Sequence, residues 1–365
     1  MHLTKSISFI NSKLFQSKTT IMQNPPFPSF SRTYPRFIQV LAILFFSFTS
    51  SMLYSQQSVL LPVNLGDKYG FIDTTGKIAI EVRFEGAMAF SEGMAAVKIN
   101  GKWGFIDATG KVIIEPQYYY SPESFSEGIA VVMAQEAVFG AIDKTGKYAV
   151  EPKYGELIFS EGVSPAQIVT ELNQKWGYID INGKEVIKPQ FAGAAAFSQG
   201  LAAVKIDSLW GYIDKTGKMI IAPQFQNAGL FSDDRALVQT GKEFNYKWGF
   251  IDQTGKLVIK AEYNWGSLGF SEGRAYVITD KHVFFIDKTG TQTGKKEYDD
   301  TWSFKNGRAA IKLKNNWGFI DLSGNLVIKP EFASVDNFYQ GFAKAQSKKK
   351  TVYINRAGKV IWTEK

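Results

Sequence analysis

The chain has 365 residues and no cysteine, which excludes disulfides, zinc–thiolate sites, a thiol nucleophile and a lipid-modified cysteine. Its formal net charge is +8, but residues 1–55 hold five basic and no acidic residues, and removing those five from 42 Lys and Arg leaves 37 against 34 Asp and Glu. This balance, with lysines spread along the chain, excludes the concentrated basic stripe that binds a nucleic-acid backbone. We therefore expect no nucleic-acid partner.

Residues 1–55 are typical of an export leader. Arg36 precedes an apolar stretch from Phe37 to Phe48, and small and polar residues follow up to Ser55. The stretch is shorter than the roughly 20 residues that span a membrane, although its extension to Tyr54 leaves an uncleaved anchor as an alternative. Cleavage predicts a mature domain of residues 56–365 with no membrane span, exported to the periplasm, the outer surface or the medium.

After the leader, the chain is a tandem repeat. The segment Lys102-Trp103-Gly104-Phe105-Ile106-Asp107 recurs with variation nine times. Its acidic position falls at Asp73, Asp107, Asp143, Asp180, Asp214, Asp252, Asp287, Asp321 and, as asparagine, Asn355. The spacing of 34 to 38 residues indicates one small supersecondary unit copied along a single repeat domain.

Alternating apolar residues predict three strands in each unit. In one copy they cover residues 203–206, 210–213 and 218–221, which gives a three-stranded antiparallel meander. The first turn of another copy is Asn100-Gly101, a strong two-residue hairpin signal. A proline such as Pro223 follows the third strand, and because it cannot donate to a ladder we expect it to end the pairing there.

The second turn of each unit carries the acidic residue and a glycine. The Asp side chain can accept hydrogen bonds from amides two residues on, and the glycine can adopt the left-handed conformation that the turn requires. The connector to the next unit carries a second Phe in a Phe-Ser-Glu-Gly turn, and we expect it to fill the gap between units. The glycine after each Trp should let the Trp ring lie over a neighbouring backbone.

These elements, in this order, resemble the WG-containing repeat family, whose members are also called KWG repeats. The resemblance covers nearly all of the chain after the leader and departs from the pattern at Phe139, at Val283-Phe284 and at Thr351-Val352. It implies a bacterial repeat module with no established enzymatic activity, assumed to mediate binding. It implies no catalytic residues.

About nine meanders can hide their strand edges by closing into a propeller-like ring or by stacking into an open β-solenoid. The resemblance of the Asp-x-Thr-Gly-Lys hairpin to propeller blades favours the ring, and the connector could add a fourth, inner strand. Against closure, the array starts at strand one and ends at strand three, so no split blade joins the termini. The sequence favours an all-β ring and leaves the solenoid open.

Catalytic groups are hard to find in this pattern. Asp287-Lys288-Thr289-Gly290-Thr291 matches the phosphorylation motif of P-type ion pumps, but other copies repeat its first four residues, which indicates turn chemistry. Glu92, Glu127, Glu161 and Glu272 recur as turn carboxylates and lack the unlike environments that glycoside hydrolysis needs. His282 is a lone imidazole. We predict no catalytic residue, no metal and no cofactor.

Two insertions depart from the pattern. The first hairpin is lengthened before Trp176 and again before Trp248, which predicts two longer loops on one face of the array. A tolerated insertion without a site is the alternative. The candidate binding residues are Glu171, Asn173, Gln174, Lys242, Phe244, Tyr246 and Trp265. Of these, Trp265 lies in a longer connector and is a secondary candidate, as are Tyr118-Tyr119-Tyr120.

From these features we expect a secreted or periplasmic non-enzymatic scaffold that binds a protein partner. A carbohydrate-binding module of the cell envelope, which would stack exposed aromatic rings on sugars, is the alternative. A hydrolase that uses rim carboxylates is the least supported function.

Overall fold

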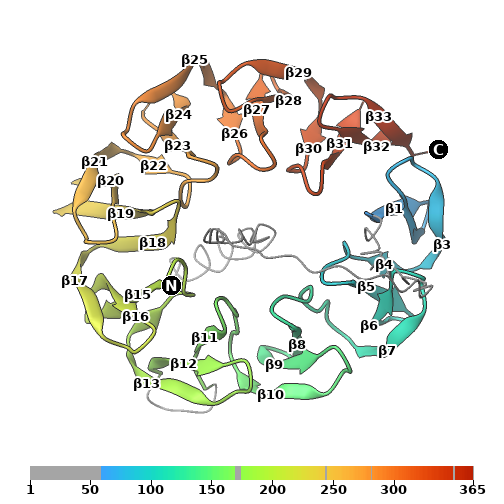
Figure 1. Ribbon diagram of the computed structural model, residues 1–365, viewed down its shortest axis with the longest axis horizontal. Coiled ribbons are helices and arrows are strands. Elements are labelled where there is room, and N and C mark those ends of the chain that lie inside the picture. Colours follow the sequence, from blue (N-terminus) through green and yellow to red (C-terminus); the bar gives the residue numbers. More distant parts are fainter. Residues whose placement is uncertain (1–58, 169–173, 243–244, 281, 348–349, 365) are drawn as a thin grey trace, which may run out of the picture. The chain divides into compact units, whose positions relative to one another are not determined.

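The computed structural model describes residues 59–364 apart from 169–173, 243–244, 281 and 348–349. Every regular element in these residues is a β-strand, and no helix there is long and apolar enough to cross a membrane. The strands form nine small antiparallel sheets that follow one another around a ring (Figure 1). The expected all-β repeat and the ring are thus confirmed as a nine-bladed β-propeller.

The sheets are numbered here as blades in chain order. Blades 1 to 3 contain β1 (Leu61–Leu65), β2 (Lys68–Ile72) and β3 (Ile78–Phe84); β4 (Gly86–Ala87), β5 (Met94–Ile99), β6 (Lys102–Asp107) and β7 (Val112–Tyr118); and β8 (Ile129–Gln135), β9 (Val138–Asp143) and β10 (Tyr148–Tyr154). Blades 4 to 6 contain β11 (Val163–Ala166), β12 (Trp176–Asp180) and β13 (Glu185–Phe191); β14 (Gly193–Ala194), β15 (Leu201–Ile206), β16 (Leu209–Asp214) and β17 (Met219–Phe225); and β18 (Asn227–Ser232), β19 (Arg235–Lys242), β20 (Asn245–Ile251) and β21 (Leu257–Tyr263). Blades 7 to 9 contain β22 (Trp265–Gly266), β23 (Arg274–Ile278), β24 (Val283–Asp287) and β25 (Gln292–Tyr298); β26 (Asp300–Thr301), β27 (Ala309–Leu313), β28 (Asn316–Ile320) and β29 (Leu326–Phe332); and β30 (Ser334–Val335), β31 (Phe342–Ser347), β32 (Lys350–Asn355) and β33 (Val360–Thr363).

Each blade contains the expected meander, and six blades add a short inner strand from the connector. In blade 2, the connector residue Met88 donates a hydrogen bond from its backbone N to Ala96 O. In blade 4, Pro165 stands at the position of Ala96 and removes an amide donor from this ladder. In blade 3, Glu123 N keeps the equivalent bond to Val131 O beside Pro122, and no inner strand is described there. In blade 1, Pro62 stands at the position of Ala96, and the connector lies outside the described residues.

A bulge interrupts the pairing between the second and third meander strands. In blade 2, Phe105 pairs with Ile114 and Trp103 pairs with Tyr118, so two steps on β6 match four on β7. Pro116 lies inside this bulge, where its missing N–H costs no ladder bond. The expectation that the proline ends the strand is therefore wrong, because pairing resumes at Tyr118.

The glycine of the Trp-Gly pair serves the same bulge. A Cβ atom on Gly104 would lie 2.4 Å from Ile114 O and 2.8 Å from Pro116 N, so the bulged strand leaves no room for a side chain. The Trp103 ring does lie against a backbone, but that backbone belongs to the inner-strand residue Gly86. The expected close approach of the Trp ring to a backbone is thus present, but the glycine that permits it is Gly86 and not Gly104.

At seven interfaces between described blades, two aromatic rings pack against each other, edge to face or tilted. Phe105 of blade 2 contacts Phe125 of the next connector with 4.8 Å between ring centroids, within a cluster that joins blades 2 and 3. This confirms that the connector Phe fills the gap between units, and each such burial stabilises the fold by about 2–3 kcal/mol. The equivalent pairs are Phe71–Phe90, Tyr178–Phe197, Tyr212–Phe231, Phe250–Phe270, Phe285–Phe304 and Phe319–Phe338.

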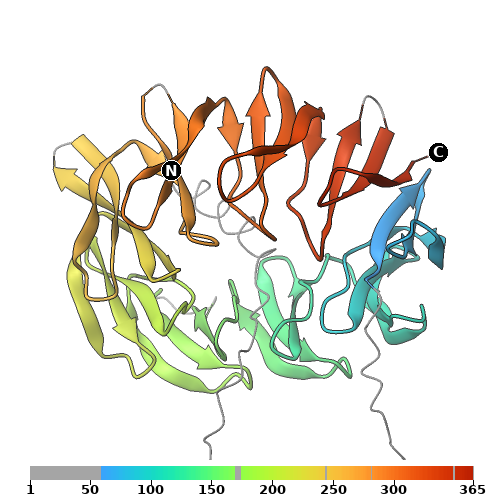
Figure 2. The same cartoon turned by 45° about the horizontal axis from the view of Figure 1, so that its top comes forward.

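The ring closes between blades 9 and 1 without a shared sheet, as the phase of the array predicted. Figures 1 and 2 both show the last blade beside the first. Tyr353 packs with Leu61, Val63 and the half-buried Trp362, and its hydroxyl donates to Pro62 O at 2.7 Å. Side-chain packing and this hydrogen bond therefore hold the seam.

A second tyrosine spans the seam on the inner side. At other interfaces a connector serine donates to the Phe carbonyl of the next blade, as Ser91 Oγ does to Phe125 O at 2.6 Å. Blade 1 has no such turn within the described residues. Tyr339 stands at the serine position of blade 9, and its longer side chain passes blade 1 and donates to Phe90 O of blade 2 at 3.2 Å.

We predict that Tyr353→Phe loosens the seam selectively. Tyr212→Phe is the matched control, because the Tyr212 hydroxyl donates to Gly229 O at 2.9 Å across the interface of blades 5 and 6. Each change should cost about 1–2 kcal/mol of unfolding free energy, since it removes one buried hydrogen bond. Hydrogen exchange should accelerate in β1 and β33 only for Tyr353→Phe. Equal acceleration in both variants would contradict a weak seam.

Candidate functional site

The ring has two faces with different turns. In blade 5, β15 begins at Leu201 opposite Asp214 and ends at Ile206 opposite Leu209. The acidic turn and the connector turn bridged by Ser198 and Leu201 therefore lie at one end of the blade, here called the turn face. The hairpin between the first two meander strands lies at the other end, here called the hairpin face.

The acidic residues of the turn face are occupied by their own turns. Asp287 Oδ1 accepts hydrogen bonds from Thr289 N at 2.9 Å, Thr289 Oγ1 at 2.6 Å and Thr291 N at 3.1 Å. The bond from the Thr289 hydroxyl is the main cause that lowers the pKa of Asp287. Asp143 and Asp214 make the same turn. The resemblance to a phosphorylation motif is therefore turn chemistry, as predicted.

The recurrent connector carboxylates link neighbouring blades. Glu127 accepts from Glu161 N at 2.7 Å and from Gly162 N at 2.9 Å. The neutral Gln199 makes the equivalent bond to Asp234 N, so the link needs an acceptor oxygen and no charge. The remaining links join Glu92 to Gly128, Glu161 to Gly200, Asp233 to Gly273 and Glu272 to Gly307.

These links place the connector carboxylates in a row from blade to blade, with no common ligand position. Two of them also pair with lysines of the following turn, Lys144 with Glu92 at 3.1 Å and Lys215 with Glu161 at 3.3 Å. His282 has one acidic partner, because its Nδ1 lies 2.7 Å from Glu297 Oε2. Within the described ranges, no three His, Cys, Asp or Glu side chains gather in a way that could hold a metal ion.

The insertion in blade 6 forms a projecting hairpin on the hairpin face. Gly241 pairs with Tyr246 and Lys242 with Asn245, whereas pairing with β21 begins only at Trp248. Residues 245–247 therefore extend past the neighbouring strand, and the Tyr246 side chain is 37% exposed. Of the other candidate here, Phe244, nothing is described.

The described residues that flank the insertion in blade 4 lie on the same face. Gln174 is exposed, and its carbonyl accepts a hydrogen bond from Gln167 Nε2 at 2.7 Å. Glu171 and Asn173 lie outside the described residues. The structure thus brings Gln174 and Tyr246 to one face in blades 4 and 6, with blade 5 between them.

The remaining aromatic candidates differ in exposure. Trp265 is half-buried in the inner strand β22, and its ring meets Trp248 edge to face at 4.7 Å, which gives it a packing role. Tyr118 is buried in the core, whereas Tyr119 is 69% exposed and Tyr120 is also exposed. The sequence showed that the connector here is longer, but not which of the three rings faces solvent.

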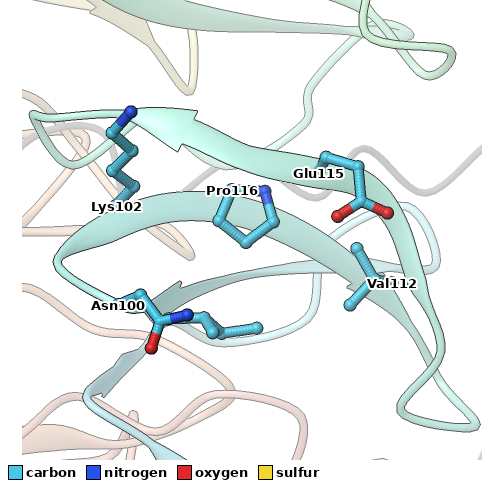
Figure 3. A pocket seen from close by; sticks show the side chains of 6 residues that line it. Asn100, Lys102, Val112, Glu115 and Pro116 are labelled. Carbon is cyan, nitrogen blue, oxygen red and sulfur yellow. The ribbon is translucent and has the colours of Figure 1, made fainter.

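A hollow on blade 2 was missed in the sequence. Its lining side chains come from the hairpin of β5 and β6 and from the bulge of β7, namely Ile99, Asn100, Lys102, Val112, Glu115 and Pro116 (Figure 3). Asn100-Gly101 and Pro116 were recognised only as turn and strand-end signals. Nothing in the pattern indicated that the bulge would place Glu115 near that hairpin.

Comparison with known families matches eight segments of the chain to the WG-containing repeat, at residues 69–103, 103–134, 139–168, 176–210, 210–244, 248–281, 284–317 and 317–350. The chain belongs to the WG-containing repeat family. The matched segments cover most of the propeller. No curated protein matches the sequence.

Solved structures resemble this WG-repeat propeller in fold. A crystal structure of a eukaryotic initiation factor matches with a TM-score of 0.52 and 13% identity, over 75% of this chain and 85% of that chain. BamB from Moraxella catarrhalis matches with a TM-score of 0.40 and 12% identity, over 69% of this chain and 90% of that chain. At these identities the first likeness supports the fold alone.

We predict that the acidic turns stabilise the WG-repeat propeller through acceptor oxygens. Asp287→Ala should lower the unfolding free energy by about 1 kcal/mol or less, because the turn is exposed and loses its acceptor. Asp287→Asn should change little at pH 7, since Asn355 already accepts from Ala357 N and Lys359 N at 3.0 Å. Urea unfolding at pH 7 measures both changes.

The same variants have a defined pH dependence. A lowered pKa means that the stabilisation by Asp287 is present above the unfolded pKa, near 4, and is lost as pH falls through the folded pKa. The stability of the native chain relative to Asp287→Asn should therefore fall between about pH 5 and pH 3. A constant difference over this range would contradict the assigned role of the carboxylate.

Proposed function

We propose that this WG-repeat propeller is an exported, non-enzymatic scaffold that binds a protein partner on its hairpin face, around blades 4 to 6. The observation that carries the proposal is the projecting hairpin of blade 6. It departs from the repeat in length, and its described residues 245–247 extend past β21.

The hairpin offers backbone as well as side-chain contacts. Residues 245–247 pair with β19 on one side but extend past β21 on the other. An extended partner segment can add to such an edge through main-chain hydrogen bonds, and the exposed Tyr246 gives an aromatic anchor beside it. The occupant that fits is a peptide segment in β conformation from a protein.

The turn face supports binding over catalysis. Its recurrent carboxylates accept hydrogen bonds from turn amides, as Asp287 and Glu127 do, and they are spread around the ring. General acid–base chemistry needs two carboxyl groups in unlike environments facing one substrate position. In this arrangement the carboxylate oxygens are instead engaged in hydrogen bonds within turns and between blades.

Export is supported by the composition of the leader. The apolar stretch after Arg36 and the small residues before Gln56 match a signal peptide, and the absence of cysteine suits a chain that needs no disulfide to fold. The N-terminus of the protein recovered from the envelope fraction, determined by mass spectrometry, tests this part. A start near Gln56 supports cleavage, whereas retention of residues 1–55 supports an anchor or an internal location.

We predict that a photo-crosslinking phenylalanine analogue in place of Tyr246 captures one protein in living cells. The full chain, expressed with its own leader, should give a discrete crosslinked band identified by mass spectrometry. The same analogue in place of Tyr148, a 39% exposed side chain on the outer strand β10, is the matched control and should give none. The expected contrast follows from the unpaired edge beside Tyr246.

Trimming the hairpins tests the same site without a probe. Deletion of residues 242–245 and 170–173 restores the shorter spacing of the other blades and should abolish recovery of the crosslinked protein by the purified chain. The melting temperature should change little, because the deletions restore the hairpin length with which the other blades fold. A trimmed chain that stays folded and recovers the same protein would refute a partner site on these hairpins.

A further inference from the structure

The hollow on blade 2 combines apolar and polar side chains in a small space. It measures about 370 Å³, near the small end of the roughly 300–1,000 Å³ of small-molecule sites. Pro116, Val112 and Ile99 give apolar surface, and Asn100, Lys102 and Glu115 contribute one amide, one ammonium and one carboxylate (Figure 3). These polar groups can both donate to and accept from a ligand that carries several hydroxyl groups.

Two of these polar side chains are free to bind. Within the described residues, no hydrogen bond or ion pair engages the Glu115 carboxylate or the Asn100 amide. The backbone that carries Asn100 is nonetheless held in one conformation, because its φ of 50° and the φ of 78° at Gly101 belong to a tight two-residue turn. The turn backbone on one side of the hollow is therefore already in place, and the Glu115 and Asn100 side chains keep their hydrogen-bonding capacity for a ligand.

An exposed aromatic ring adjoins the hollow. Lys102 Nζ lies 4.8 Å from the centroid of the Tyr119 ring, a cation–π contact that holds the ring beside the hollow. Tyr119 follows the buried Tyr118 where Glu85 and Gln226 stand in blades 1 and 5, and at 69% exposure it is the most exposed of the large hydrophobic side chains in the described residues. The fold does not need this ring for packing.

No equivalent combination exists on blade 5, which has the same strand plan. There Ala222 takes the place of Glu115, Asp207-Ser208 replaces Asn100-Gly101, and the connector after Phe225 has no tyrosine. Glu81 in blade 1 and Glu151 in blade 3 stand at the position of Glu115, but blades 1, 3 and 5 have no asparagine at the position of Asn100 and no aromatic residue at that of Tyr119. A feature that the repeat itself required would recur.

We propose that the hollow of blade 2, together with Tyr119, binds a neutral oligosaccharide. A sugar ring presents an apolar C–H face that packs on an aromatic ring, and its hydroxyl groups both donate and accept hydrogen bonds. Tyr119 receives the C–H face, Glu115 and the Asn100 carbonyl oxygen accept, and Lys102 and the Asn100 NH₂ group donate. The opposite charges of Glu115 and Lys102 suit a ligand without net charge.

The open shape of the hollow determines the affinity that we expect for a sugar. A hollow this shallow buries one or two sugar rings, which supports a dissociation constant on the order of 1 mM for a free oligosaccharide. Several chain ends on a polysaccharide surface would raise the apparent affinity by multivalency only if several propellers were held together. The site therefore serves to locate the scaffold on a glycan surface and is independent of the protein site proposed on blades 4 to 6.

The test is saturation-transfer NMR with the full chain and three neutral probes, cellotetraose, chitotetraose and isomaltotetraose. At least one probe should receive saturation at millimolar concentration. Tyr119→Ala and Glu115→Ala should each weaken that signal by about tenfold, because each removes one of the two principal contacts. Both side chains are exposed, and an unchanged melting temperature confirms that the variants fold.

Tyr246→Ala is the matched control and should keep the signal, since it removes an exposed tyrosine on blade 6, outside the hollow of blade 2. Absence of transfer to all three probes would overturn the proposal. So would a signal that survives Tyr119→Ala or disappears in Tyr246→Ala, because sugar binding would then lie elsewhere. Crosslinking of a protein through position 119 in cells would assign the surface to a protein partner instead. Loss of sugar binding with unchanged protein capture at Tyr246 separates this site from the scaffold function.

Discussion

The edge-to-face contact between aromatic rings of successive blades is the interaction on which the propeller depends. A three- or four-stranded blade is too small to bury both of its faces, so each blade needs its neighbours. The ring of Phe105 or its equivalent in one blade meets the connector Phe of the next at nearly constant distance, as in Phe105–Phe125 and Phe319–Phe338. Such a pair joins seven of the nine interfaces, and between blades 3 and 4 the connector Phe159 packs with Ala141 instead. This repeated packing sets the angle between blades, and the summed angle closes the ring.

Where this contact is missing, the structure uses other means. At the interface of blades 9 and 1, described residues provide no connector Phe, and Tyr353 instead packs on β1 and bonds to Pro62 O. Tyr339 reaches past blade 1 to Phe90 O. Two hydroxyl groups at the seam thus take over part of the work that ring pairs and connector carboxylates do elsewhere, and burial keeps the Tyr353 hydroxyl protonated by raising its pKa.

The two faces of the ring divide structural and functional roles. On the turn face, the most regular residues of the sequence are engaged in hydrogen bonds within turns and between blades, as with Asp287 and Glu127. On the hairpin face, the repeat varies in length and composition, and there Tyr119 and Tyr246 are exposed. Departures from the repeat therefore indicate binding residues better than the recurrent carboxylates do, because residues that recur in every copy are needed for each copy to fold.

The sequence by itself determined the repeat, its strands and the chemistry of its turns, because these depend on residues close together in the chain. The Asp-x-Thr-Gly turn and the Asn100-Gly101 hairpin are local, and so is the loss of an amide donor at Pro165 in blade 4 once the register is known. Pairing across a bulge is not local, which is why Pro116 was taken as a strand end and the role of Gly104 was misassigned. Only the tertiary structure decided between ring and solenoid, because closure depends on the summed angle between blades. Only the tertiary structure placed Glu115, Lys102 and Tyr119 around one hollow, because their proximity requires the register of β7 on β6.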